Sequence, residues 1–100
     1  MASFLYTPEP DEQVRLVRPA GSHWSVEELQ ALVGGYFEVK RTIDGRFMVI
    51  NELGKVVVPQ LPLNKQATRI YQHGRVDPIV GPAVVVDTKE EIDGPDDDEG

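Results

Sequence analysis

The chain contains few side chains of the types that carry out chemistry. Its two histidines, His23 and His73, have no histidine three or four residues away, and the chain has no cysteine that could complete a zinc site. Ser25 is expected to cap a helix and is therefore not available as a nucleophile. Gly34 and Gly35 follow that helix, whereas a phosphate-binding loop precedes one. We therefore expect no metal, no cofactor and no enzymatic activity.

Charge is unevenly distributed along these 100 residues. The formal net charge of −7 arises in residues 87–100, where eight acids are opposed by one lysine. The preceding residues balance nine acids with nine lysines and arginines. A nucleic-acid-binding domain needs a basic surface to neutralise phosphates, so this balance disfavours nucleic acid as a partner.

The composition also bears on the cellular compartment. Small secreted domains are often rich in disulfides, whereas this sequence has no cysteine. The first residues lack the apolar core of a signal peptide, and no segment approaches the roughly 18 apolar residues of a membrane span. We therefore expect a cytoplasmic protein without a membrane segment.

The clearest local signal is the start of a helix at Ser25. Ser25 and Glu28 have the spacing of a capping box, in which each side chain accepts a hydrogen bond from the other residue's backbone amide. Trp24 and Leu29 occupy the two positions of a hydrophobic staple. The spacing of the following apolar residues predicts a helix over residues 25–33, ended by Gly34.

A hairpin is predicted immediately after this helix. Residues 36–43 and 46–51 are rich in β-branched and aromatic side chains, and Asp44-Gly45 between them favours a two-residue type I′ turn. This register places four apolar residues on one face, which we expect to pack under the helix: Phe37, Val39, Met48 and Ile50.

The remaining patterns complete an α+β fold with a small mixed or antiparallel sheet of about four to five strands and two short helices. Strands are predicted at residues 13–18, briefly at 55–58, and at 79–86, where Gly81-Pro82 indicates a bulge or an edge position. A second helix is predicted over residues 65–71 with Asn64 as its N-cap. The expected order is strand, helix, strand, strand, a brief strand, helix and strand. A core this small gains stability from homodimerisation, which the sequence leaves open.

Both ends of the chain are expected to lie outside this fold. Residues 1–12 contain prolines and acids, which predict a mobile N-terminal arm. Residues 89–100 are too polar to bury apolar surface and predict a disordered acidic tail. The single domain is accordingly expected to span residues 13–88.

Several segments of the sequence resemble one family. They are Trp24 to Gln30, Val33 to Glu38, Asn51 to Lys55, Leu63-Asn64 with Ala67-Thr68, and Ile79 to Gly81. Together they are similar to domain of unknown function 3846, a family found in bacteria, bacteriophages, plasmids and some large viruses. The resemblance covers roughly residues 14–86. It implies a setting in mobile genetic elements and no particular activity.

The leading hypothesis is a non-catalytic interaction module, encoded by a phage or plasmid, that binds a host or element-encoded protein. Its binding surface is predicted on the hairpin face with Tyr36, Glu38 and Asn51, extended by Asn64. An amphipathic tyrosine beside polar groups is typical of recognition patches. The structural alternative is that Tyr36 packs against another element.

Two other functions remain open on the sequence. The first is a small-ligand binder that sequesters a nucleotide signal, with Tyr36 stacking on the ligand and Asn51 or Asn64 hydrogen-bonding it. A concave site between protomers would distinguish this function. The second is a single-stranded nucleic-acid binder in which Phe47 and Tyr36 provide stacking platforms beside Lys40.

Overall fold

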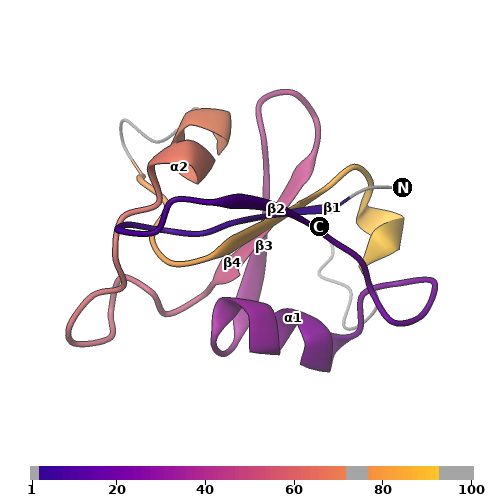
Figure 1. Cartoon of the computed structure of the whole chain (residues 1–100), viewed down its shortest axis with the longest axis horizontal. Helices are drawn as coiled ribbons and strands as arrows, with labels where there is room; N and C mark the ends of the chain where they lie inside the picture. Colours follow the sequence, from indigo (N-terminus) through magenta and orange to yellow (C-terminus); the bar gives the residue numbers. More distant parts are fainter. Residues whose placement is uncertain (1–2, 72–76, 93–100) are drawn as a thin grey trace.

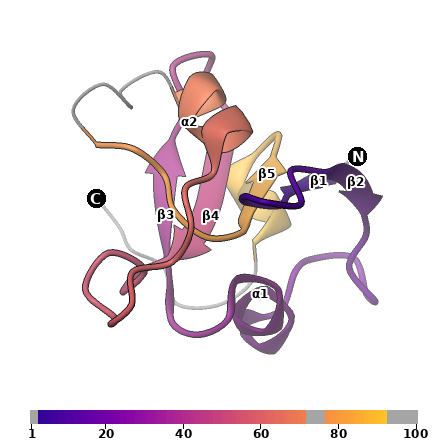
Figure 2. The same ribbon diagram turned by 60° about the vertical axis from the view of Figure 1, so that its left-hand side comes forward.

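The computed structural model describes residues 3–71 and 77–92. It confirms an α+β fold with one five-stranded antiparallel sheet in the order β2-β1-β5-β4-β3. Helix α2 lies on one face of this sheet and α1 on the other (Figures 1 and 2). The elements are β1 (Ser3–Tyr6), β2 (Val14–Val17), α1 (Val26–Val33), β3 (Phe37–Arg41), β4 (Phe47–Asn51), α2 (Lys65–Tyr71), β5 (Ala83–Val86) and the 3₁₀ turn η1 (Lys89–Glu91).

Helix α1 begins and ends as predicted. The Ser25 hydroxyl accepts from the Glu28 amide at 3.1 Å, and the Glu28 carboxylate accepts from the Ser25 amide at 2.9 Å, so the capping box is formed. Trp24 and Leu29 are both buried in the core beneath the helix. Gly34 ends the helix with φ of 88°, a left-handed conformation that glycine adopts without steric cost.

Each face of the sheet carries its own apolar core. Between the sheet and α1 lie seven buried residues: Leu5, Trp24, Leu29, Val33, Val49, Val84 and Val86. The α2 face has a second cluster formed by Met48, Ile50, Ala67, Ile79, Ala83 and Val85. Because the central strands β4 and β5 are buried on both faces, nearly every residue in them is apolar.

The hairpin forms, but its predicted register is wrong by one residue. Val39 pairs with Val49, and the connection is a loop closed by Thr42, whose backbone amide donates to the Arg46 carbonyl at 2.8 Å. Gly45 adopts a φ of 90° at the end of this three-residue loop, as in a type I turn with a bulge. A one-residue shift moves side chains to the opposite face. Met48 and Ile50 therefore face α2 rather than α1.

The prediction of a mobile arm over residues 1–12 is wrong for residues 3–6. These residues form β1, an interior strand that pairs with β2 on one side and with β5 on the other. Ser3 and Leu5 are buried on the α1 face. The prolines at positions 8 and 10 lie in the turn between β1 and β2, so they end the strand and do not exclude it.

The boundary predicted at residue 88 is also wrong. The Trp24 amide donates to the Glu91 carbonyl at 2.7 Å, and Ile92 packs against the α1-side core. The Trp24 indole donates to the buried Ser3 hydroxyl at 3.0 Å, and this hydroxyl in turn donates to the Glu91 carboxylate at 3.4 Å. Residues 89–92 thus close the core below β1. The predicted disorder of residues 93–100 lies outside the described residues.

Two further strand predictions need correction. Residues 55–58 form a turn followed by a bend instead of a strand. The last strand, β5, begins after Pro82 and occupies the middle of the sheet, so of the two positions predicted from Gly81-Pro82, a bulge or an edge, the edge is wrong. Because Pro82 precedes the strand, its missing N–H removes no hydrogen bond from the ladder.

Candidate interaction surface

Exposed apolar side chains gather in the loop between β4 and α2 and at the start of the adjoining hairpin. Val58 is 96% exposed, Val56 70% and Tyr36 68%, and the set is completed by Leu53 and Val57. We call these five residues the loop surface. The loop projects from the sheet at the lower left of Figures 1 and 2.

Backbone hydrogen bonds hold the loop surface together. The Glu52 amide donates to the Tyr36 carbonyl at 2.8 Å, which places Leu53 one residue from this pairing. The amides of Val56 and Val57 both donate to the Leu53 carbonyl at 3.0 Å. These bonds connect the segment at Tyr36 with Leu53, Val56 and Val57, and Val58 follows directly in the sequence.

Asn51 positions this loop. Its amide nitrogen donates to the Val33 carbonyl at 3.1 Å, and its amide oxygen accepts from the Leu53 amide at 2.8 Å. Asn51 thereby joins the end of α1 to the start of the loop. Its cross-strand partner is Phe37, so its side chain starts from the opposite face to that of Glu38.

The base of the loop is tightly packed. The Leu61 amide donates to the Gly54 carbonyl at 3.0 Å. A β-carbon added at Gly54 would lie 3.0 Å from the Val80 side chain and 3.2 Å from that of Leu61. The close approach needs glycine at position 54, and it fixes the base while the valines extend outward.

A shallow hollow of about 80 Å³ adjoins the loop surface. Charged residues from three segments line it: Glu38 and Lys40 from β3, Glu52 and Lys55 from the loop, and Asp77. Lys40 Nζ lies 3.2 Å from an Asp77 carboxylate oxygen, and Lys55 pairs with the other oxygen of the same carboxylate. Lys40 also lies over the Tyr71 ring, 5.4 Å from its centroid.

The ion pairs shift the pKa values of these groups. The hydrogen bond from Lys55 is the main cause that lowers the pKa of Asp77, with a further contribution from Lys40 and an opposing effect of burial. Burial alone would lower the pKa of Lys40, but Asp77, Glu38 and Tyr71 outweigh it and raise that pKa. Both shifts favour the charged forms, so the hollow presents an ionised pair at neutral pH.

The four predicted binding residues do not form one surface. Tyr36 is exposed, and Glu38 lies at the rim of the hollow. Asn51 is half-buried, and Asn64 has no exposed surface. The Asn64 amide nitrogen donates to the carbonyls of Tyr6 and Gly81 at 2.9 and 2.8 Å, and its oxygen caps α2 by accepting from the Ala67 amide.

The sequence reading missed most of the loop surface. Residues 56–58 are three consecutive valines, a pattern that favours a strand, and nothing local shows that they remain exposed. The Lys40–Asp77 pair was missed because its residues are far apart in the sequence. The outward Lys55 and the prolines at positions 59 and 62 were the available signals for a loop.

Residues 3–71 and 77–92 contain neither a metal-binding cluster nor a membrane-spanning helix. No three His, Cys, Asp or Glu side chains in these ranges gather closely enough to hold a metal ion. No helix in this part of the chain is long and apolar enough to cross a membrane. His23 is exposed and its ring lies 2.9 Å from the Ser22 hydroxyl, whereas His73 lies outside the described residues.

The fold and surface together define a small α+β domain with an exposed apolar loop beside paired charges. The sequence model of DUF3846, a domain of unknown function, matches residues 4–98, and the chain belongs to this family. The match begins inside β1 and so includes the strand that the sequence reading assigned to a mobile arm. No curated protein and no solved structure matches the chain.

Proposed function

We propose that this protein is a non-catalytic interaction module that binds another protein through the loop surface. The observation that carries the proposal is the exposure of Tyr36 and of four apolar loop residues in segments that a backbone hydrogen bond joins. Contiguous exposed apolar side chains rimmed by polar groups are characteristic of protein interaction sites. The setting in mobile elements implied by the family resemblance suggests a host or element-encoded partner.

The composition of the surface supports a protein partner. Tyrosine adds large contact area at low cost in conformational entropy and is enriched among residues that dominate binding energy. The neighbouring Glu38, Lys40 and Asp77 would form a polar rim around the apolar centre. Because Lys40 and Asp77 already neutralise each other, the rim favours a partner patch without a strong charge of its own.

The same geometry supports a non-catalytic role. A lysine acts as a nucleophile or base when its surroundings lower its pKa, whereas the surroundings of Lys40 raise it. The adjoining hollow of about 80 Å³ is also much smaller than the roughly 300–1,000 Å³ of typical ligand pockets. Asn51 and Asn64, proposed as ligand contacts in the nucleotide-signal alternative, use their side chains to bind the backbone.

Affinity capture with the full chain as bait tests the proposal. Tyr36→Ala and Val58→Ser should each retain the wild-type fold, because both side chains are mostly exposed, and should lose the captured protein. Ile43→Ser is the matched control, since Ile43 is 57% exposed but lies in the hairpin loop. Equal capture by the folded loop variants and the control would contradict the proposal. So would the absence of any protein specifically captured by the wild type.

A further inference from the structure

On the α2 face of the sheet, the two edge strands expose different kinds of side chain. One row of cross-strand neighbours runs Lys40, Met48, Val85, Phe4 and Leu16, and the next runs Glu38, Ile50, Ala83, Tyr6 and Val14. Both rows begin with a charge on edge strand β3. Both end with an apolar residue on edge strand β2, where Leu16 is 52% exposed and Val14 46%.

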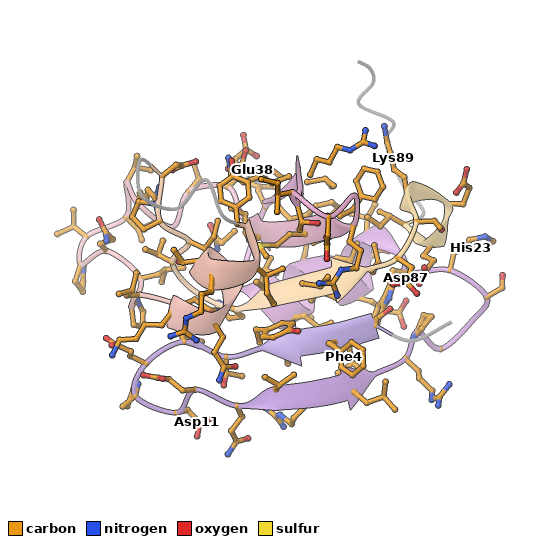
Figure 3. All side chains as sticks on the ribbon, turned by 90° about the horizontal axis from the view of Figure 1, so that it is seen from above. Phe4, Asp11, His23, Glu38, Asp87 and Lys89 are labelled. Carbon is orange, nitrogen blue, oxygen red and sulfur yellow. The ribbon has the colours of Figure 1, made fainter. Side chains whose placement is uncertain are left out.

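Helix α2 leaves this end of the face uncovered. Its residues Ala67, Ile70 and Tyr71 pack in a cluster with β4, β5 and Tyr6 of β1, and this cluster does not include Phe4 or a residue of β2. Figure 3 looks down on this face and shows the Phe4 side chain on the β1–β2 part of the sheet, beside α2 rather than beneath it. Phe4 is half-buried. The uncovered apolar strip thus consists of Phe4, Val14 and Leu16.

Among residues 3–71 and 77–92, no strand pairs with the outer edge of β2, so its backbone is also available there. The Thr7 amide donates to the Gln13 carbonyl at 2.8 Å, which makes Thr7 and Gln13 a hydrogen-bonded pair. Pairs alternate in an antiparallel ladder, so Leu5–Arg15 is the next such pair and Val14 and Leu16 belong to the other kind. The backbone N–H and C=O groups of Val14 and Leu16 therefore point away from β1, toward the unpaired edge.

We propose that β2 pairs antiparallel with β2 of a second copy of this chain. A two-fold axis at Leu16 makes each Leu16 the partner of its symmetry mate, with outward-pointing backbone groups on both. This register opposes Arg15 to the partner's Val17 and Val14 to the partner's Arg18. It extends the sheet across both copies and continues the apolar strip from one to the other.

The apolar strip is complementary to itself, which favours a second copy, and charge is compatible with this register. An axis at Arg15 would place two arginines directly opposite each other, which is destabilising. The axis at Leu16 places no like charges directly opposite each other and pairs apolar side chains at the centre. The β3 edge is unsuited to the same contact, because Glu38, Lys40 and Arg41 are three of its five residues.

Sedimentation equilibrium of the full chain tests this inference. The wild type should form a dimer that dissociates on dilution, and Leu16→Lys should weaken association by about 100-fold, because the substitution acts on both sides of the axis. Ile43→Lys is the control, since it adds the same charge at a similarly exposed residue outside β2. This control should dimerise like the wild type.

A loss of association is evidence for the dimer contact only if the Leu16 variant remains folded. Thermal unfolding establishes that Leu16→Lys remains folded, and Leu16→Thr retains a good strand former if it does not. A wild type that stays monomeric up to about 1 mM would overturn the inference, even if a different protein occupies this edge. A dimer that neither Leu16 variant weakens would overturn it as well.

Discussion

The two edge strands of this sheet show how one fold can present two different surfaces. At the β3 edge, Lys40 is held by Asp77 and lies over the Tyr71 ring, so α2 and the segment near Asp77 cover the neighbouring face. At the β2 edge, Val14 and Leu16 occupy the equivalent rows, and no helix in the described part of the chain lies above them. We call these the guarded edge and the open edge. Charged residues and covering elements are the usual means by which proteins block unwanted strand pairing, and here they are concentrated at one edge.

The difference between the edges depends on the two helices. Helix α1 contacts β3, β4 and β5, and α2 packs over β4 and β5. Both helices therefore cover the half of the sheet that includes the guarded edge. On the α1 face, Trp24 and Ile92 complete the core near β1, so the open edge is uncovered mainly on the α2 face.

The largest expected effect is the loss of stability when Asn64, which anchors α2 over the half of the sheet that includes the guarded edge, is replaced. Asn64→Ala should destabilise the fold by about 3 kcal/mol, because the carbonyls of Tyr6 and Gly81 lose their donor and the Ala67 amide loses its acceptor. Asn64→Ser should cost less, since serine can still cap α2. Chemical denaturation measures both values. An Asn64→Ala variant as stable as the wild type would show that Asn64 does not anchor α2 to β1.

A second prediction concerns the closure of the core beneath β1. A chain ending at residue 88 should be about 2 kcal/mol less stable than one ending at residue 92, because Ile92 leaves the core and the Trp24 amide loses its acceptor. The comparison isolates residues 89–92. Thermal unfolding followed by Trp24 fluorescence measures it. Equal stability of the two truncated chains would mean that η1 contributes nothing to the fold.

A smaller loss of stability is expected at the N-terminus of α1, the helix on the other face of the sheet. Ser25→Ala should cost about 1 kcal/mol, because the Glu28 amide loses its side-chain acceptor. Ser22→Ala is a useful control, since Ser22 is exposed and its hydroxyl bonds to the ring of the exposed His23. The unfolding midpoint should fall for the first variant and stay unchanged for the second. Unchanged midpoints for both would contradict the observed capping box.

The smallest expected effect is a pH dependence at the hairpin loop, beside the guarded edge. Hydrogen bonds from Arg46 and Thr42 lower the pKa of Asp44 from 3.8 to about 2. Because the pKa of Asp44 is lower in the folded state than in the unfolded state, its ionised carboxylate stabilises the fold at pH values above the unfolded-state pKa. This stability is lost as the pH falls from about 4 toward 2. The Asp44 side chain is 52% exposed, so solvent screening reduces the contribution to about 0.5 kcal/mol.

Asp44→Asn checks this linkage. The variant should lose less stability than the wild type between about pH 4 and pH 2, since the titrating carboxyl is gone. Denaturation curves at several pH values in this interval measure the difference. Parallel curves for the two proteins would exclude a role for the Asp44 carboxylate in the hairpin loop.

Local signals in the sequence were sufficient for the elements whose determinants are adjacent in the chain. The capping box of Ser25 and Glu28 and the N-cap Asn64 defined both helix starts correctly. The hairpin was identified from Asp44-Gly45, but its register depends on Thr42, whose hydroxyl accepts from the Arg46 amide at 2.9 Å and favours a longer loop. The dipeptide Asp44-Gly45 alone does not show whether the chain forms a two-residue turn or the three-residue loop that Thr42 closes.

Features that depend on distant residues could not be read in the same way. Residues 3–6 form an interior strand only because β5, nearly 80 residues later, supplies a partner. The same limit applies to the surface. Asn64 was interpreted as a binding residue because nothing nearby in the sequence shows that its amide reaches the carbonyls of Tyr6 and Gly81.

Amide hydrogen exchange measured at increasing protein concentration tests the contrast between the edges most directly. The Leu16 amide points outward from the open edge, and the Val39 amide points outward from the guarded edge, because Thr42–Arg46 and Tyr36–Glu52 fix the hydrogen-bonded pairs of the hairpin. Protection of the Leu16 amide should rise with concentration as β2 pairs with a second copy, whereas protection of the Val39 amide should not change. Concentration-independent exchange at Leu16, or an equal rise at Val39, would contradict the account.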